Sequence, residues 1–210
     1  MRLHGYFRSG ASWRVRIALN LKGLSVTHSF HHLRRGEQRA PTYLALNPQG
    51  LVPALELEDG TVLTQSMAII EWLDETYPTP ALLPLDKVHR AKARSFALVL
   101  AADTHPLQNL KVLNALQKLG VSEESVRDWA AEVNTEGLEA CEALLSNVDG
   151  PYCFGAAPTL ADICLVPQLG NARRFGVDVR RFPRLIEAEA ACLQLQAFAE
   201  AVPDRQPDSE

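Results

Sequence analysis

The residues best suited to chemistry lie in one short stretch near the start of the chain, Arg8-Ser9-Gly10-Ala11-Ser12. It carries a cation and two hydroxyl groups and precedes a segment with helical periodicity, which predicts a turn at a helix N-terminus. The backbone N–H groups of Gly10, Ala11 and Ser12 are expected to have no partner inside the helix and to face a bound group, and the helix dipole adds positive potential. The turn could therefore stabilise a bound anion, with Ser9 as a hydroxyl donor. Helix capping by Ser9 or Ser12 explains the same residues without a ligand.

Two further stretches could bind the backbone or the carboxylate of a ligand. In "NPQGLVPALE", a cis Val52-Pro53 peptide bond would turn the Val52 backbone groups outward, where they could pair with a peptide-like ligand. An ordinary start of a strand is the alternative. In "QSMAIIEWL", Gln65 precedes Ser66, which is expected to be the N-cap of a helix. A helix N-terminus suits a ligand carboxylate, although an N-cap serine needs no function.

The remaining candidates lie in the second half of the chain. His105, Gln108 and Asn109 fall within one helical turn in "HPLQN" and form a polar group beside an expected kink. Arg173 and Arg174 end a predicted helix, where cations also complement the helix dipole. The six histidines show no spacing typical of metal ligands, so no metal is expected.

Elements of mixed type must position the first of these groups. The expected elements of residues 1–80 are a strand over 3–7, a helix over 12–22, a strand over 25–30, a hairpin over 53–63 with a two-residue turn at Asp59-Gly60, and a helix over 67–77. Three prolines between residues 78 and 86 mark a boundary.

Everything after this boundary is helical in pattern. The expected helices cover 85–119 with a kink at Pro106, 122–145 with Ser122 as N-cap, 160–175 opened by a capping box from Thr159 to Asp162, and 183–201. The last eight residues, "PDRQPDSE", are expected to fray. The sequence therefore predicts a small α/β unit followed by an all-α unit.

Composition limits the setting in which this chain works. The net charge of −4 gives no overall field that would favour nucleic acid, and no apolar run reaches the ~20 residues needed to span a bilayer. The four cysteines lie in the second half without a CxxC pair, mostly among apolar neighbours. They are expected to be buried thiols in a reducing compartment, and the predicted location is cytoplasmic.

Taken together, these motifs resemble the glutathione transferase superfamily, and more narrowly its zeta class with the bacterial maleylacetoacetate and maleylpyruvate isomerases. "RSGASWRVRIAL" is similar to the zeta motif Ser-Ser-Cys-x-Trp-Arg-Val-Arg-Ile-Ala-Leu, and "NPQGLVPALE", "QSMAIIEWL", "HPLQNL", "TLADICLVPQ" and "NARRF" follow in the family's order. The resemblance implies an α/β plus all-α fold. A thioredoxin-like domain over 1–80 would bind glutathione, a helical bundle over 86–210 would bind substrate, and two copies would form a homodimer.

The resemblance also implies residue roles. Ser9 matches the family's thiol-activating hydroxyl, and Arg8 and Arg174 match cations that hold the carboxylates of a small dicarboxylate substrate. The residues expected to contact glutathione are Ser9, Gly10, Ala11, Gln38, Val52, Pro53, Gln65, Ser66, His105, Gln108 and Asn109.

Two positions of the opening turn depart from the family motif. Gly10 replaces its second serine and Ala11 replaces its cysteine, so the turn holds no protein thiol and redox chemistry is not expected. Ser9 is then the leading activator. Ser12 could substitute only if the turn brings its hydroxyl round.

The implied reaction is the glutathione-dependent cis–trans isomerisation of maleylacetoacetate in tyrosine and phenylalanine catabolism, by reversible addition of the glutathione thiolate. A free thiol with a pKa of about 8.5 is only slightly ionised at neutral pH, and lowering that pKa by two units needs roughly 2.7 kcal/mol. A helix N-terminus supplies about 0.3–2 kcal/mol and a hydrogen bond to a charged acceptor about 1.5–3 kcal/mol. Together, Ser9 and the neighbouring amides could suffice.

Other activities stay open at this point. Maleylpyruvate is the nearest alternative substrate, but its isomerases are expected to carry an arginine after "HPxxN", where this chain has Leu110. Small α-halo acids are another. A general conjugating transferase would consume glutathione, whereas an isomerase would not. A non-catalytic interaction module would not need Gln65-Ser66, Val52-Pro53 and the arginines together.

Overall fold

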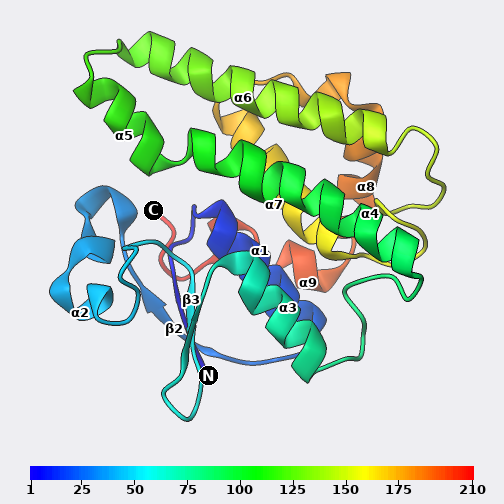
Figure 1. The fold of residues 1–210 in the computed structure, drawn as a ribbon, viewed down its shortest axis with the longest axis horizontal. Coiled ribbons are helices and arrows are strands. Elements are labelled where there is room, and N and C mark those ends of the chain that lie inside the picture. Colours follow the sequence, from blue (N-terminus) through cyan, green and yellow to red (C-terminus); the bar gives the residue numbers. More distant parts are fainter. The chain divides into compact units, whose positions relative to one another are not determined.

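The computed structural model describes all 210 residues, which form two compact units. The first unit contains residues 1–81 and 195–210, and the second contains residues 82–194. Figure 1 shows both as a ribbon, with most of their helices and strands labelled. The sequence led us to expect a helical part that runs to residue 210. In the structure the helical unit ends at residue 194, because the last sixteen residues belong to the first unit.

The first unit is built on a mixed four-stranded sheet of order β2-β1-β3-β4. Its strands are β1 (Arg2–Gly5), β2 (Thr27–Phe30), β3 (Ala54–Glu56) and β4 (Val62–Thr64). β1 pairs with β2 in parallel and with β3 antiparallel, and β3 pairs antiparallel with β4. A parallel pair needs a crossover connection, which α1 supplies here. The predicted order of strand, helix, strand, hairpin and helix is confirmed, but the segment between β2 and β3, which the sequence predicts only as a connection, contains a short helix over Pro41–Leu44 and two 3₁₀ turns.

Helices bury the apolar side chains of this unit. The helices are α1 (Gly10–Leu21), α2 (Pro41–Leu44), α3 (Ser66–Thr76) and α9 (Gln196–Ala199), with 3₁₀ turns at Leu33–Arg35, Glu37–Arg39 and Pro203–Arg205. α1 packs against α3 and α9. The fully buried core includes Leu3 and Leu55 of the sheet, Val15 and Ile17 of α1, and Leu73 of α3.

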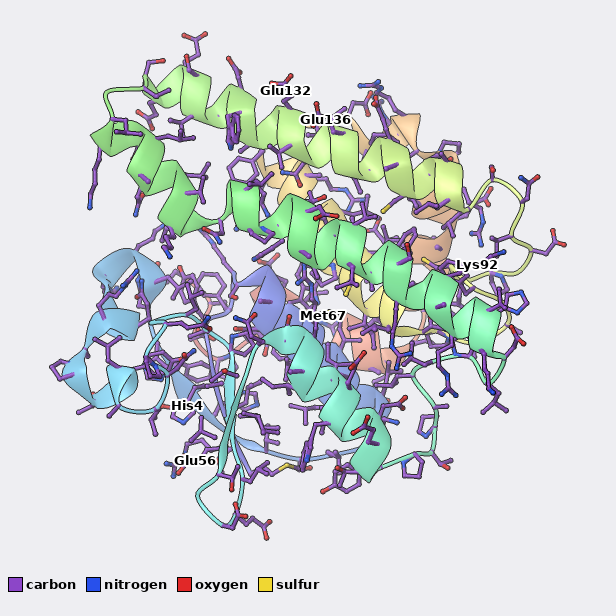
Figure 2. All side chains as sticks on the ribbon, viewed as in Figure 1. His4, Glu56, Met67, Lys92, Glu132 and Glu136 are labelled. Atoms are coloured by element: carbon purple, nitrogen blue, oxygen red, sulfur yellow. The ribbon has the colours of Figure 1, made fainter.

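Polar groups also meet on this sheet. His4 of β1 lies 3.4 Å from a carboxylate oxygen of Glu56 on the neighbouring β3, and both side chains are labelled in Figure 2. The other nitrogen of the His4 ring, Nδ1, lies 3.0 Å from Nε2 of His31. No group of three or more histidine, cysteine or acidic side chains is arranged to hold a metal ion.

The hairpin turn is longer than predicted. Leu57 N–H donates to the Thr61 carbonyl at 2.8 Å, and Gly60 N–H donates back to the Leu57 carbonyl at 3.1 Å. Gly60 has φ 85°, a conformation that glycine adopts without steric penalty. Residues 58–60 therefore form a three-residue loop with a left-handed glycine, rather than a two-residue turn at Asp59-Gly60.

The second unit is all helical. Its helices are α4 (Lys87–Leu98), α5 (Leu110–Lys118), α6 (Glu123–Leu144), α7 (Leu160–Arg174) and α8 (Pro183–Leu193), with a π-helical turn at Val99–Thr104 and 3₁₀ turns at His105–Gln108 and Val179–Arg181. α7 is the central helix, because nearly every residue from Leu160 to Ala172 is buried. None of the helices is both long and apolar enough to cross a membrane.

Side-chain N-caps begin these helices largely where the sequence predicts. Ser122 Oγ accepts from the Ser125 N–H at 3.1 Å and starts α6. The Thr159 to Asp162 capping box opens α7, and the buried Asp162 also accepts from the Cys153 N–H at 2.8 Å. The predicted helix over 85–119 is broken rather than kinked, because Asn109 leaves the helical conformation (ψ 160°) and its side chain caps α5.

Candidate functional site

Ser9 is the N-cap of α1. Its Oγ accepts a hydrogen bond from the Ser12 N–H at 3.2 Å, and its own N–H donates to the Tyr6 carbonyl at 3.0 Å. The hydroxyl oxygen serves as an acceptor in this cap, so the hydroxyl proton remains available for an outside acceptor. Capping and donation to an anion are therefore compatible roles for Ser9.

Two backbone donors accompany this hydroxyl. The N–H groups of Gly10 and Ala11, the first two residues of α1, make no hydrogen bond within the chain. Donors of this kind at a helix N-terminus, with the positive end of the dipole, favour a bound anion. The expectation that the Ser12 amide joins them is wrong, because the cap already occupies that N–H.

Ser12 does not have the accessibility that an activator needs. Its exposed fraction is 0%, and a Cβ atom built on Gly5 of β1 would lie 3.4 Å from its Oγ. The Ser12 hydroxyl is therefore buried between α1 and β1. The prediction that Ser12 could replace Ser9 as the thiol activator is corrected by this burial.

Arg8 lies directly before the cap. Its guanidinium carbon stands 5.0 Å from the centre of the Phe7 ring, a cation–π contact that steadies the side chain. The side chain is half-buried, and no carboxylate of the chain forms an ion pair with it. Arg8 thus remains available to bind a ligand's carboxylate.

The loop before β3 is held by a buried tyrosine. The Val52-Pro53 peptide bond is cis. The carbonyl of the preceding Leu51 accepts from the Tyr43 hydroxyl at 2.6 Å and from the Asn47 side chain at 2.7 Å. Burial raises the pKa of Tyr43 to about 12, so this donor keeps its proton at neutral pH. The backbone N–H and C=O of Val52 make no hydrogen bond within the chain and can pair with an extended ligand.

Gln65, rather than Ser66, is the N-cap of α3. Gln65 has φ 69°, the one positive φ outside glycine, and Ser66 is the first helical residue and is buried. A non-glycine residue held in this region costs roughly 1–3 kcal/mol and is typical of ligand-binding sites. The predicted N-cap role of Ser66 is therefore wrong by one residue.

Sequence reasoning missed Gln49 in the same unit. Its Oε1 accepts from the Gln65 side chain at 2.8 Å, so it orients the residue in the strained conformation. Its position in the "NPQG" stretch beside Val52 was the available signal. Gln38, which was predicted, lies in the 3₁₀ turn after β2, where its Nε2 donates weakly to the Leu33 carbonyl at 3.4 Å and its buried Oε1 has no hydrogen-bond partner.

In the second unit, the two arginines that end α7 have different surroundings. Arg173 donates to both carboxylate oxygens of Glu189, one of them at 2.6 Å, and the Glu189 side chain is only 8% exposed. This ion pair raises the pKa of Arg173 further. Arg174 is exposed, donates to the Asn171 side chain at 2.8 Å, and stacks on Phe175.

The polar group around Pro106 is partly structural. Asn109 Oδ1 accepts from the Val112 N–H at 3.1 Å and caps α5. Gln108 is buried, its amide nitrogen lies 3.5 Å from Nδ1 of His105, and its Oε1 has no partner. The structure does bring these three residues together, while their contact with glutathione stays a prediction.

Each candidate group in the first unit can hold one part of an anionic peptide. The α1 N-terminus with Ser9 suits a thiolate, Val52 suits a peptide unit, and the α3 N-terminus at Ser66 suits a carboxylate. A sheet of order β2-β1-β3-β4 with one parallel pair and a cis-proline before β3 has the features of a thioredoxin-like domain. The class defined by this unit is therefore a glutathione-binding protein with an attached helical unit.

Comparison with known proteins agrees with that class. The family model described as the glutathione S-transferase N-terminal domain matches residues 8–76. The maleylacetoacetate isomerase of Pseudomonas aeruginosa is 48% identical over 100% of this chain and 99% of its own length. A solved maleylpyruvate isomerase, described as a bacterial glutathione S-transferase of the zeta class, is 46% identical with a TM-score of 0.97 over the whole of both chains.

A second solved structure adds ligands. The maleylacetoacetate isomerase of Methylobacterium extorquens AM1, with bound malonate and glutathione, is 41% identical with a TM-score of 0.97 over the whole of both chains. The present chain belongs to the family of these maleylacetoacetate and maleylpyruvate isomerases, within the zeta class of glutathione transferases. The resemblance inferred from the sequence motifs is thereby confirmed.

Proposed function

We propose that this protein isomerises maleylacetoacetate to fumarylacetoacetate, with glutathione as a cofactor that is regenerated in each cycle. The observation that carries the proposal is the arrangement at the start of α1. Ser9 caps the helix while its hydroxyl proton stays available, two amide N–H groups are unoccupied, and the turn holds no protein thiol. Such a turn has the donors to keep a bound thiol ionised but cannot supply the thiol itself.

The reaction conserves atoms and electrons. The glutathione thiolate adds to the cis carbon–carbon double bond, a C–S bond forms, and the electron pair moves through the conjugated system onto the carbonyl oxygen as an enolate. Rotation occurs about the resulting single bond. The enolate then collapses, the C–S bond breaks, and the trans double bond and the thiolate return.

Ser9 and the Gly10 and Ala11 amides would stabilise the thiolate that starts this cycle. A hydrogen bond to a charged acceptor contributes about 1.5–3 kcal/mol, and the helix N-terminus about 0.3–2 kcal/mol. A shift of one unit in the thiol pKa corresponds to about 1.4 kcal/mol. The combined donors thus account for a pKa lowered by about two units.

The other assignments follow the chemistry of each group. We assign glutathione's cysteinyl backbone to Val52 and its γ-glutamyl carboxylate to Gln65 and Ser66, with Gln38, His105, Gln108 and Asn109 as additional contacts. Arg8 and Arg174 would bind the carboxylates of the substrate and stabilise the enolate. The Methylobacterium relative was solved with a dicarboxylate and glutathione bound together, which supports this pairing of ligands.

The cellular setting and the assembly are also proposals. Four buried free cysteines are typical of a protein from a reducing compartment, which supports a cytoplasmic location. A homodimer is proposed from the family resemblance. We further propose that residues 1–80 bind glutathione and that helices between 86 and 194 bind the substrate.

Maleylpyruvate is the second candidate substrate, because relatives of both activities are nearly equally identical to this chain. Leu110 favours maleylacetoacetate: it is exposed at the start of α5 and supplies no cation for the shorter diacid. Comparing kcat/KM for the two substrates decides between them. A Leu110→Arg variant should move the ratio toward maleylpyruvate.

The primary test is an isomerase assay with and without glutathione, in which free glutathione is measured before and after. We expect no turnover without glutathione and no net consumption of it. Full activity without glutathione, or stoichiometric formation of a stable thioether, would overturn the proposed function.

A further inference from the structure

Phe7, the residue directly before the Arg8-Ser9 turn, is held through both its backbone N–H and its backbone carbonyl by charged side chains. The Phe7 N–H donates to Asp208 Oδ2 at 2.9 Å, a contact across 201 residues of sequence. The Phe7 carbonyl accepts from the Arg16 guanidinium at 3.0 Å. The sheet does not hold this residue, because β1 ends at Gly5.

Arg16 connects the Phe7 carbonyl to the C-terminal segment. It is 6% exposed, and its Nε donates to the Ala201 carbonyl at 3.0 Å while its Nη2 donates to the Phe7 carbonyl at 3.0 Å. Burial lowers the pKa of Arg16 to about 10, and the Asp208 carboxylate opposes this effect. Arg16 therefore remains charged at neutral pH, and Asp208 and Arg16 act on Phe7 as a pair.

The C-terminal segment is ordered by contacts along its length, so the predicted frayed tail is wrong. Asn20 of α1 donates to the Ala197 carbonyl at 2.9 Å, and the buried Gln206 side chain donates to the Val202 carbonyl at 3.0 Å. At its end, Glu210 pairs with His32 and Arg35 at 3.0 and 3.1 Å. Figure 1 shows this segment, in red, beside the blue start of α1.

Burial of Asp208 at this position costs folding free energy. Its second carboxylate oxygen, Oδ1, is buried and has no hydrogen-bond partner. An unsatisfied buried acceptor costs about 1–3 kcal/mol, and a group of this kind in a folded protein calls for an explanation. The adjacent turn offers one, because a thiolate donor must be held to about half an ångström.

We propose that Asp208 is a positioning residue for the active-site turn: through the Phe7 N–H it fixes where Ser9 presents its hydroxyl to the bound glutathione thiol. The C-terminal segment thus completes the thiol-activating turn. This inference rests on the function proposed above. It adds a role for residues near the C-terminus that no motif of the sequence indicated.

Two substitutions separate the hydrogen bond from the charge. Asp208→Ala removes both, whereas Asp208→Asn keeps an acceptor oxygen for the Phe7 N–H and removes only the charge. Asp204→Asn is the matched control, since Asp204 lies exposed in the same segment and makes no contact with Phe7. The readouts are the pKa of enzyme-bound glutathione, from the ultraviolet absorbance of its thiolate, and kcat and KM measured separately.

Positioning predicts a specific pattern. Asp208→Ala should raise the bound thiol pKa by about one unit and lower kcat about tenfold to a hundredfold, with little change in KM for glutathione. Asp208→Asn should stay within about threefold of the wild type, and Asp204→Asn should equal it. If Asp208→Ala does not fold, Arg16→Met tests the other backbone contact of Phe7, because a methionine has no donor for the Phe7 and Ala201 carbonyls; it should also raise the thiol pKa.

The opposite outcomes are equally distinct. A lowered melting temperature with an unchanged thiol pKa and pH profile would make Asp208 a purely structural contact and overturn the proposal. A thiol pKa that falls in both Asp208 variants would show that the charge acts directly and not through position. Failure of the proposed function looks different, since the wild type itself would then bind glutathione without lowering its thiol pKa.

Discussion

The Ser9 hydroxyl oxygen accepts a hydrogen bond from the backbone N–H of Ser12 at 3.2 Å, across the first turn of α1. This contact gives the groups of the turn separate roles. The Ser9 oxygen caps the N-terminus of α1, and the hydroxyl proton is left for a ligand. The amides of Gly10 and Ala11 remain as further donors. The first prediction follows from this division.

Replacing Ser9 by alanine should separate capping from catalysis. Loss of the hydroxyl donor should lower kcat/KM about tenfold to a hundredfold and raise the bound thiol pKa by about one to two units. We expect the smaller effect in both ranges, about tenfold in kcat/KM and about one unit in the thiol pKa, because the released Ser12 amide can then donate to the thiolate. Steady-state kinetics and thiolate absorbance across pH measure both effects.

The matched control is Ser122→Ala, which removes the equivalent cap of α6. Both alanine variants should lose about 0.5–2 kcal/mol of unfolding free energy. Only Ser9→Ala should lose activity, and Ser9→Thr should restore it. Equal kinetics in Ser9→Ala and the wild type would transfer thiol activation to the backbone amides alone.

The two arginines at the end of α7 should have opposite phenotypes. Arg174→Ala should raise KM and lower kcat/KM for the diacid with little change in stability, because Arg174 is exposed. Arg173→Ala should leave the kinetics unchanged and destabilise the fold by about 1–3 kcal/mol, because it strands the buried Glu189 carboxylate. Denaturant unfolding and initial rates on both variants test this, and an exchange of the two phenotypes would refute the assignment of Arg174.

The cysteines should be inert in the native protein. All four are 0% exposed, and burial raises the pKa of Cys141, Cys153 and Cys192. A thiol without thiolate character and without access reacts slowly with alkylating reagents. Iodoacetamide should therefore leave the activity intact and modify four thiols only after unfolding. Rapid inactivation of the folded enzyme would mean that a protein thiol takes part.

Acid should destabilise the first unit through His31. Burial, and then the neighbouring His4, lower the pKa of His31 below its ordinary value near 6.5. A lowered histidine pKa stabilises the fold above pH 6.5, and this contribution is lost as the pH falls through the folded-state value. His31→Gln should flatten the decline in unfolding free energy below pH 6.5. Urea melts at pH 8 and pH 5 provide the comparison, and parallel slopes in wild type and variant would refute it.

The sequence alone was enough to predict the elements whose signals are local. Helical periodicity gave α1, α3 and α7, and the capping box from Thr159 to Asp162 identified the start of α7 because both partners lie within four residues. The ordered motifs indicated the family. Even within this local range, single positions were missed: Ser66 lies one residue inside α3, since a strained Gln65 takes the cap position.

Only the tertiary structure decided the relationships between residues that are far apart in the sequence. Whether Ser12 faces a ligand depends on the packing of α1 against β1, which buries its hydroxyl beside Gly5. The return of residues 195–210 to the first unit, with Asp208 on Phe7, had no sequence signal. Periodicity and caps report interactions within one or two turns of chain, whereas a contact across 201 residues is set by the packing of the whole unit.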